Sequence, residues 1–341
     1  MTILVTGAAG FIGYHLCRRL LERGETVVGV DNLNAYYDPS LKRDRLAQLE
    51  PGVLGGGGGR FVFVRASLEE AGSLDRVFAE HRPHRVVNLA AQAGVRHSID
   101  NPSVYVQANL VGFGLLLEAC RHHRIEHLVY ASSSSVYGGN TELPFRESQP
   151  VNHPVSLYAA TKKANELMAH TYSHLYQLPA TGLRFFTVYG PWGRPDMALF
   201  LFTRSILNGE PIKVFNHGQM VRDFTYIDDI IESLVRVLDK PATGDPAFDP
   251  ARPDPATSWA PHRLFNIGNC QPTPLRHYIE AIEAATGRTA IQELLPMQPG
   301  DLPATAADCS RLETWTGFRP ATPVAEGVAR FVAWYRDYYG A

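Results

Sequence analysis

Short apolar runs alternate along the first half of the chain with longer segments in which apolar residues recur at helical spacing. The strand-like runs are Thr2–Thr6, Thr26–Val30, Arg60–Arg65, Arg85–Ala90 and His127–Ser132. The helix-like segments are Phe11–Arg23, Leu74–His81, Asn101–His123 and one that begins near Ser156 and continues past Leu175. Because this alternation is typical of parallel strands joined by crossover helices, it predicts an α/β fold with a doubly wound parallel sheet.

Helix ends and interruptions fit the same pattern. Gly24 is placed to end the first helix, and Asn101 and Pro102 are placed as the N-cap and first residue of a later one. Two segments break the alternation: Pro51–Arg60, with its glycine run 55–59, and the Pro- and Asp-rich stretch Lys240–His262. We expect both to be surface excursions, and the sequence assigns neither of them a function.

Composition narrows the class of protein. The chain has 341 residues, of which 45% are hydrophobic, enough for two lobes or one enlarged domain. A formal net charge of -2 gives no electrostatic reason to expect nucleic acid or an anionic membrane as partner. The four cysteines are far apart, no basic leader precedes the first strand, and no run is expected to reach membrane-spanning length. We therefore expect a cytoplasmic protein.

A glycine motif joins the first strand to the first helix. "TGAAGFIG" places Gly7, Gly10 and Gly13 at G-x-x-G-x-x-G spacing, where glycine allows a tight turn and the backbone amides approach a pyrophosphate. Close packing of helix on strand is the alternative explanation. Asp31, which follows the second strand, favours the pyrophosphate-binding explanation. Its carboxylate can accept hydrogen bonds from the adenosine ribose hydroxyls and would repel a 2′-phosphate. The motif predicts NAD rather than NADP.

"YAATKKANE" places Tyr158 and Lys162 four residues apart, on one face of a helix. A phenol has a pKa near 10 in water, so it acts as a base near neutrality only when a close positive charge favours the phenolate. Lys162 supplies such a charge. The alternative is a surface tyrosine beside a lysine. The glycine motif and the serine run Ser132–Ser135 upstream favour a catalytic pair.

The combination of "TGAAGFIG", "SSSSVYG" and "YAATK" resembles the extended short-chain dehydrogenase/reductase superfamily, in its sugar-nucleotide branch. "DNLNAYYDPSLK", "AAQAGVR", "LRFFTVYGPWGRPDMA", "RDFTYIDDI" and "QPGD" are most similar to the UDP-glucuronate 4-epimerases, which interconvert UDP-glucuronate and UDP-galacturonate. The resemblance implies a Rossmann-type NAD-binding domain over residues 1–189, with 223–268 partly returning to it. It implies a smaller α/β domain for the UDP-sugar over 190–222 and 269–341.

The resemblance also implies roles for single residues. Ser133 matches the residue that hydrogen-bonds the reacting sugar hydroxyl, Tyr158 the base, and Lys162 its support and ribose anchor. Ser67 stands where relatives often carry an Asp that contacts adenine, so that contact is weakened here. The positions that match the cofactor site are Gly7, Gly10, Phe11, Ile12, Gly13, Asp31, Asn32, Ser67, Leu68, Leu89, Ala90, Ala91, Gln92, Asn109, Tyr158 and Lys162.

For the substrate, the resemblance implies a second set of residues. Arg222 and Asp301 match residues that hold the UDP diphosphate and ribose, although Arg222 is alternatively an ion-pair partner of Asp223. Gln298 stands where the usual arginine of "RPGD" lies, which removes one positive charge. The full set is Arg96, Ser133, Ser134, Ser135, Thr187, Arg194, Arg222 and Asp301.

The serine run separates the candidate activities. Related dehydratases and decarboxylases carry an acid between the catalytic Ser/Thr and "VYG", whereas this chain has Ser134 and Ser135. Neutral donors suit an anion, and glucuronate carries a carboxylate; Thr187 and Arg194 are placed for the same group. Hydrated surface positions are the alternative for the serines and for Arg194. The histidines have no ligand spacing, so no metal is expected.

The resulting hypothesis is an NAD-dependent 4-epimerase that works through a 4-keto intermediate. The alternatives are a UDP-glucuronate decarboxylase (UDP-xylose synthase), a neutral UDP-hexose 4-epimerase and a non-catalytic NAD sensor, which would usually have lost Tyr158 or Lys162. Relatives pair as homodimers through two long helices, which correspond here to Asn101–His123 and Ser156–Leu175. We expect the same pairing, because the apolar residues of these helices exceed what one sheet face needs.

Overall fold

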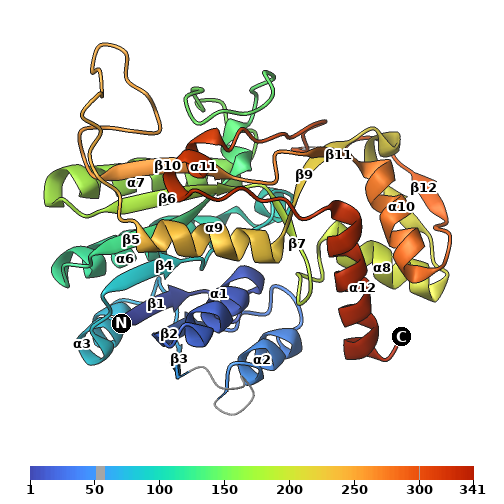
Figure 1. Ribbon diagram of the computed structural model, residues 1–341, viewed down its shortest axis with the longest axis horizontal. Coiled ribbons are helices and arrows are strands. Elements are labelled where there is room, and N and C mark those ends of the chain that lie inside the picture. Colours follow the sequence, from blue (N-terminus) through green and yellow to red (C-terminus); the bar gives the residue numbers. More distant parts are fainter. Residues whose placement is uncertain (51–57, 299) are drawn as a thin grey trace. The chain divides into compact units, whose positions relative to one another are not determined.

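The computed structural model describes residues 1–50, 58–298 and 300–341 (Figure 1). Residues 51–57 of the predicted excursion Pro51–Arg60 lie outside the described residues. The chain divides into two compact units. Unit 1 comprises Met1–Thr141, Glu147–Phe185 and Leu234–Asn266, and unit 2 comprises Glu142–Arg146, Phe186–Ser233 and Ile267–Ala341.

The main sheet confirms the predicted doubly wound arrangement. In the described chain its strands follow the order β10-β6-β5-β4-β1-β2-β3. Their bounds are β1 Thr2–Thr6, β2 Thr26–Asp31, β3 Arg60–Arg65, β4 Arg85–Asn88, β5 His127–Ser133, β6 Ala180–Phe185 and β10 His262–Ile267. β1 pairs in parallel with both β2 and β4, so the strand order reverses there. In sheets of this kind ligands bind at the carboxyl ends of the strands beside the reversal.

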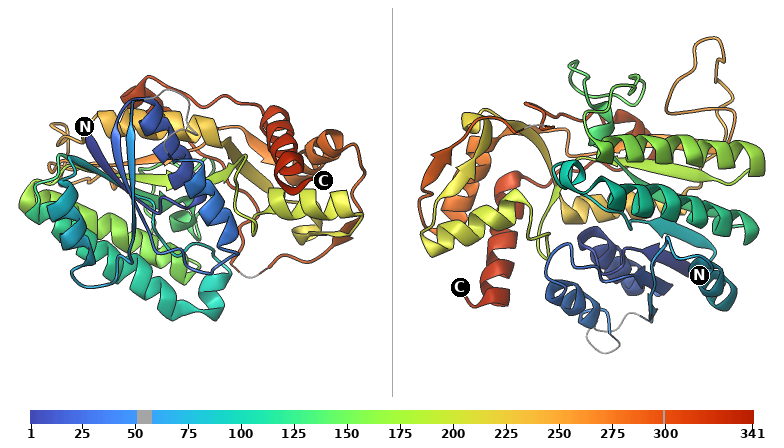
Figure 2. Two further views of the ribbon diagram at one scale, coloured as in Figure 1. Left: turned by 90° about the horizontal axis from the view of Figure 1, so that it is seen from below. Right: turned by 180° about the vertical axis from the view of Figure 1, so that it is seen from behind.

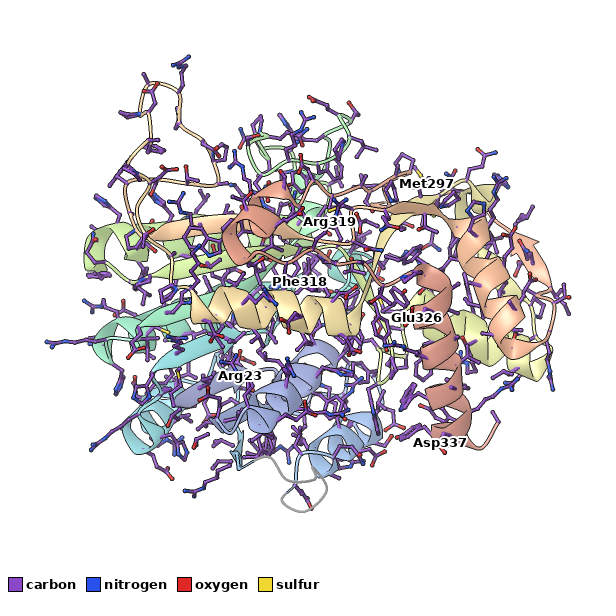
Figure 3. The ribbon with its side chains drawn as sticks, viewed as in Figure 1. Arg23, Met297, Phe318, Arg319, Glu326 and Asp337 are labelled. Atoms are coloured by element: carbon purple, nitrogen blue, oxygen red, sulfur yellow. The ribbon has the colours of Figure 1, made fainter. Side chains whose placement is uncertain are left out.

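Helices cover both faces of this sheet (Figure 2). α3 (Ser73–His81), α6 (Gly112–His122) and α7 (Leu157–Tyr176) share one core with the sheet, in which Phe78, Leu116 and Ala169 are fully buried. α1 (Phe11–Glu22) lies on the opposite face. Arg23 after α1, labelled in Figure 3, pairs at 3.0 Å with Asp239 at the end of α9 (Ile227–Asp239). The expected helix end at Gly24 is confirmed, since its φ is +81°.

The predicted helix Asn101–His123 is built from three segments. They are α5 (Pro102–Tyr105), a π-helix over Val106–Val111, and α6. Pro102 is the first helical residue, as expected, but the side chain of Asn101 contacts His97 instead of capping the helix. The short α4 (His97–Asp100) precedes it, and α2 (Ser40–Ala47) follows β2.

One expectation about membrane-spanning length is wrong. Among the described residues, helix Pro102–His122 has 21 residues and a mean hydropathy of 1.3, enough by length and composition to cross a membrane. However, 44% of its most apolar stretch is buried inside the structure, where α6 contributes to the core of unit 1. The apolar character of this helix is therefore partly explained by packing on the sheet.

α7 positions two of the predicted catalytic residues. Ser156 is its N-cap, and its hydroxyl accepts a hydrogen bond from the amide of Ala159 at 3.1 Å. Tyr158 therefore lies in the first turn of the helix and Lys162 one turn further on. The 3-10 helix Ser134–Tyr137, which follows β5 directly, packs against α7.

Unit 2 has its own small sheets and helices. β7 (Thr187–Tyr189), β9 (Val221–Tyr226) and β11 (Pro272–Pro274) pair in the order β11-β9-β7, and β8 (Ile212–Val214) pairs with β12 (Gln292–Leu294). The helices are α8 (Ala198–Asn208), α10 (Leu275–Thr286), α11 (Ser310–Thr316) and α12 (Val324–Tyr339). Phe224 stacks on Tyr278 with ring centroids 3.8 Å apart, so β9 is fixed against α10.

Candidate active site

The glycine motif forms a turn in which the helix lies too close for side chains. Gly7 has φ +71°, and a Cβ atom there would lie 2.8 Å from the amide nitrogen of Ala90. A Cβ on Gly13 would lie 2.0 Å from the carbonyl oxygen of Gly7. Glycine is thus required by the close approach of α1 to the turn. The first amides of α1 remain available for an anion, as in nucleotide-binding turns.

A buried arginine that the sequence reasoning missed supports this turn. Arg45 of α2 is fully buried, and its Nη1 donates to the carbonyl of Ala9 at 3.0 Å and to the hydroxyl of Tyr37 at 2.7 Å. The signal was an arginine on the buried side of a short helix within "SLKRDRLA". Sequence alone does not say which groups such an arginine meets.

Asp31 lies at the end of β2 beside the same turn. One carboxylate oxygen accepts from the amide of Ala9 at 3.2 Å, and the other accepts from the amide of Leu33 at 2.8 Å. Each carboxylate oxygen has a second lone pair, so ribose hydroxyls can still be accepted. Asn32 donates to the hydroxyl of Ser67 at 3.0 Å, which brings two further predicted cofactor positions together.

The position of Asp31 leads to a prediction about cofactor choice. We expect the protein to bind NAD at least about 100-fold more tightly than NADP, because a 2′-phosphate beside Asp31 would face a carboxylate. Asp31→Asn keeps the shape and one acceptor oxygen, so it should narrow that ratio mainly by improving NADP binding. Titration of both proteins with both dinucleotides measures the ratio. A wild-type preference for NADP would contradict the prediction.

The predicted positions after β4 are held by hydrogen bonds from the π-helix and from β1. Asn109, in the π-helix, accepts from the amide of Gln92 at 2.8 Å and donates to its carbonyl at 3.1 Å. The Asn109 amide also donates to Thr161 of α7 at 3.0 Å. At the end of β1, Thr6 accepts from the amide of Ala90 at 3.2 Å. The segment that contains Leu89, Ala90, Ala91 and Gln92 is therefore fixed at the point where the strand order reverses.

The remaining cofactor and substrate positions of unit 1 differ in exposure. Phe11 and Leu68 are buried, Ile12 is half-buried, and Arg96 is exposed just before α4. The structure thus places Arg96 at a surface of unit 1.

The predicted catalytic residues of unit 1 lie on neighbouring elements. Ser133 ends β5, and its hydroxyl accepts from the amide of Ser135 at 3.2 Å. The ammonium of Lys162 donates to the carbonyl of Ala131 in β5 at 2.8 Å. The ring of Tyr158 packs edge-on against Tyr105, with centroids 6.1 Å apart. Because α7 packs on β5, the serine, the tyrosine and the lysine belong to one corner of the sheet.

Burial changes the acidity of Lys162. The side chain is only 2% exposed, and burial lowers the pKa of Lys162 to about 8. At pH 7 the amine is still mostly protonated, so it supplies the positive charge that a phenolate at Tyr158 needs. The same pKa makes this charge sensitive to mildly alkaline pH.

The serine run faces two directions. Ser132 is buried, and its hydroxyl donates to the carboxylate of Glu166 at 2.7 Å. Ser133 is also buried, whereas Ser134 and Ser135 are half-buried. Ser132 is therefore part of the protein interior, and the three serines after it are those available to a ligand.

The predicted substrate residues of unit 2 are carried by β7, β9 and two loops. Thr187 begins β7 and pairs with Phe224 of β9. The guanidinium of Arg194 forms an ion pair with Asp196. In the same loop Trp192 packs against Trp334 of α12, with centroids 5.2 Å apart. These contacts fix the loop that carries Arg194 within unit 2.

Arg222 is brought close to the segment that follows Asp301. Its Nη1 donates to the carbonyl of Pro303 at 3.3 Å and to that of Val221 at 2.9 Å. Asp223 is buried, and its carboxylate accepts from the amides of Asn269, Cys270 and Ala307. Backbone amides are thus partners of Asp223, which the sequence had offered as the alternative partner of Arg222.

Comparisons with known proteins agree with this geometry. Residues 3–254 match the model of the NAD dependent epimerase/dehydratase family. The chain is 53% identical over 339 residues to Protein CapI of Staphylococcus aureus, covering 99% of each chain. It is 49% identical to the probable UDP-glucuronate 4-epimerase of Rhizobium meliloti, covering 99% of this chain and 98% of that one.

A solved structure is similar over the whole chain. The UDP-glucuronic acid 4-epimerase of Bacillus cereus, in complex with UDP-glucuronic acid and NAD, superimposes with a TM-score of 0.87. It is 32% identical in sequence, and the match covers 99% of this chain and 100% of that one.

Proposed function

The chain belongs to the NAD dependent epimerase/dehydratase family, and from that premise we propose that it is a UDP-glucuronate 4-epimerase that uses NAD. The observation that carries the proposal is the corner formed by Ser133, Tyr158 and the buried Lys162, in a chain that matches UDP-glucuronate 4-epimerases along its length. The proposed product is UDP-galacturonate.

The residues present fit NAD. A side chain at Gly7 or Gly13 would collide with the backbone of the segment after β4 or of the turn itself, so glycine keeps this turn tight enough for a dinucleotide to approach. Asp31 lies where the adenosine ribose would be held. When bound, NAD accepts a hydride from the C-4 carbon of the sugar and returns it. Asp31 accepts hydrogen bonds at one end of the cofactor site, and Lys162 supplies a positive charge at the other.

The chain's own residues move the proton. Tyr158, with Lys162 beside it, takes the proton of the 4-hydroxyl group as the C–H bond at C-4 breaks. Loss of this proton and of the C-4 hydride leaves a 4-keto sugar, whose oxygen Ser133 holds by a hydrogen bond. The keto sugar then turns within the site, so that the hydride returns to its opposite face. Tyr158 then gives the proton back to the oxygen on the inverted carbon. In unit 2, Arg222 and Asp301 hold the diphosphate and ribose of UDP.

The carboxylate of glucuronate separates this proposal from its alternatives. Ser134 and Ser135 occupy the positions where an acid would serve a dehydratase or decarboxylase. Half-buried hydroxyls there can donate to an anion, and Thr187 and Arg194 serve the same carboxylate in the proposal.

Identification of the product tests the proposed function. Purified protein incubated with UDP-glucuronate, without added NAD, should yield UDP-galacturonate with little carbon dioxide. UDP-xylose with stoichiometric carbon dioxide would identify the decarboxylase instead. Turnover of UDP-glucose but not of UDP-glucuronate would identify a neutral hexose epimerase. The absence of any turnover would contradict the proposal that the protein is an enzyme.

We also propose that the protein is a cytoplasmic homodimer paired through the long helical segment Pro102–His122 and through α7. The helices of unit 1 keep large apolar side chains in solvent, among them Val104 (41% exposed), Val111 (39%), Leu167 (59%), Leu175 (59%) and Tyr176 (44%). These residues lie on the two long helices named by the sequence. Exposed apolar side chains on two helices that pack side by side are typical of an interface, and a second copy is the proposed occupant.

The dimer predicts a change of mass on mutation. Wild-type protein should sediment at twice the chain mass, and Leu167→Glu should shift the equilibrium toward monomer by placing a carboxylate in the apolar contact. Ile291→Glu is the matched control, because Ile291 is equally exposed (56%) but lies in unit 2. Sedimentation equilibrium of the three proteins measures this. A monomeric wild type, or dissociation by the control alone, would contradict the interface.

A further inference from the structure

Lys162 lies midway between two residues that compete for its charge. Tyr158 is four residues before it on α7 and Glu166 is four residues after it. Each is therefore one turn, about 6 Å of helix rise, from Lys162. In an isolated helix a lysine and a glutamate at this spacing attract each other. Lys162 can serve the phenol only if Glu166 does not draw it away.

The structure keeps Lys162 and Glu166 apart. The ammonium of Lys162 donates to the carbonyl of Ala131 at 2.8 Å, and the next residue of β5, Ser132, donates to Glu166 at 2.7 Å. Among the ion pairs of the described residues, none joins Lys162 to Glu166, although both side chains are buried. Two successive residues of one strand thus hold the two members of the helical pair.

Arg184 of β6 neutralises Glu166. Its Nε and Nη2 donate to the two carboxylate oxygens at 2.8 and 3.0 Å, and both side chains are at most 1% exposed. Burial alone would raise the pKa of Glu166, but the charge and hydrogen bonds of Arg184 outweigh it, so the pKa is lowered. Glu166 is therefore an anion whose charge is directed toward β6.

Arg184 is itself fixed by neighbours. Its Nη1 donates to the hydroxyl of Tyr137 at 3.1 Å, and that hydroxyl donates to Asn266 of β10 at 2.6 Å. The amide of Asn266 donates to the buried Glu147 at 2.8 Å. Apart from Glu166, the guanidinium is held directly by Tyr137, whose hydroxyl is fixed in turn by Asn266, so Arg184 is restrained if the carboxylate moves.

Other titratable groups around Glu166 are neutral or peripheral. Burial lowers the pKa of His262 to about 3, and burial raises the pKa of Tyr130, so both are uncharged near neutrality. Lys163 contacts Glu166 at 3.3 Å from the solvent side, with 19% of its side chain exposed. The titratable and charged groups that interact with the carboxylate are Arg184 of β6, Lys163 of α7, Tyr130 of β5 and His262 of β10; His170 faces His262, and Tyr137 faces Arg184.

We propose that Arg184 and Ser132 are positioning residues for proton transfer: by holding Glu166 they leave Lys162 directed at Tyr158. The inference rests on the proposed function, because it assigns Tyr158 as the base. It accounts for an arginine inside the otherwise apolar strand "TGLRFF" and for the first serine of the run. Neither residue is proposed to touch the substrate.

The test is the pH dependence of kcat with UDP-glucuronate. Arg184→Met leaves a buried carboxylate one turn from Lys162, so the acidic limb of the profile should move to higher pH by about one unit. At pH 7 this would lower kcat about tenfold while NAD content stays unchanged. Arg184→Lys, which keeps the charge, should move the limb less. Arg184→Met combined with Glu166→Leu removes both charges and should restore the wild-type limb.

If Arg184→Met does not fold, Ser132→Ala provides the test, since it removes only one hydrogen bond to Glu166. Ser132→Ala should also move the acidic limb of the pH profile to higher pH, by less than the shift expected for Arg184→Met. Two outcomes overturn the inference. One is an acidic limb that does not move in Ser132→Ala or in any Arg184 variant that folds. The other is an acidic limb that moves as far in Arg184→Met with Glu166→Leu as in Arg184→Met alone. Failure of the proposed function is distinguishable, because then Tyr158→Phe would turn over UDP-glucuronate normally or the wild type would not turn it over.

Discussion

Tyr158→Phe should lower kcat for UDP-glucuronate by at least about two powers of ten, while NAD and the UDP-sugar bind almost normally. The substitution removes the phenolic oxygen that takes the 4-hydroxyl proton. It keeps the ring, which packs edge-on against Tyr105 in the wild type. Lys162 keeps its contact with Ala131, because that hydrogen bond does not involve Tyr158. The loss should therefore appear in the chemical step and not in binding.

Tyr172→Phe is the matched control for this prediction. Tyr172 lies on the same helix, fourteen residues further on, and its hydroxyl donates to Glu118 of α6. The control removes the same atom from α7 without touching the corner at the end of β5. Steady-state turnover, NAD content and a binding titration with UDP-glucuronate measure the three quantities. Turnover at the wild-type rate in Tyr158→Phe would refute the assignment of the base.

Ser134→Ala should change the product as well as the rate. Oxidation at C-4 converts the uronate into a β-keto acid, which loses its carboxylate readily when the carbon–carbon bond stands perpendicular to the ketone plane. Hydrogen bonds from Ser134, Ser135 and Thr187 are proposed to hold the carboxylate away from that geometry. One hydrogen bond to a charged group contributes about 1.5–3 kcal/mol. Its loss should raise the ratio of decarboxylation to epimerisation about tenfold or more.

The measurement is carbon dioxide release together with the absorbance of reduced cofactor. Each decarboxylation leaves a UDP-4-keto-pentose. Bound NADH then accumulates, because the 4-keto uronate that should take the hydride back is no longer present. Ser132→Ala is the matched control, since that hydroxyl bonds to Glu166 and should not alter the product ratio. Thr187→Ala is expected to behave like Ser134→Ala. If both variants merely slow down, with no added carbon dioxide or NADH, these hydroxyls do not restrain the carboxylate.

The fold of unit 1 was predictable from local patterns. Strand–helix alternation predicts parallel strands with crossover helices, and β1 to β5 lie as expected, with α1 and α3 between them and α7 after β5. Such features are readable because they depend on side-chain periodicity, on glycine at φ +81° after α1, and on Ser156 as an N-cap. The π-helix Val106–Val111 was not readable, because nothing in its spacing distinguishes it from an α-helix.

Candidate cofactor and catalytic residues could also be proposed from the sequence, because each belongs to a short motif with its own chemistry. Gly7, Asp31, Tyr158 and Lys162 are examples: their roles follow from spacing within one turn or one helix, or from an expected strand end. The roles of the cofactor, catalytic and substrate residues remain predictions, as do the separate roles of the two domains.

Only the tertiary structure decided which groups these residues meet. Lys162 and Glu166 have a spacing at which the two charges attract each other in an isolated helix, and the sequence analysis assigned Ser132 no role beyond membership of the serine run. In the structure Arg184, eighteen residues after Glu166, takes the carboxylate, and Ser132 turns into the interior to join it. The physical reason is burial: a charge removed from water needs its partners within hydrogen-bonding distance. Those partners come from strands and helices whose meeting is set by packing, not by spacing along the chain.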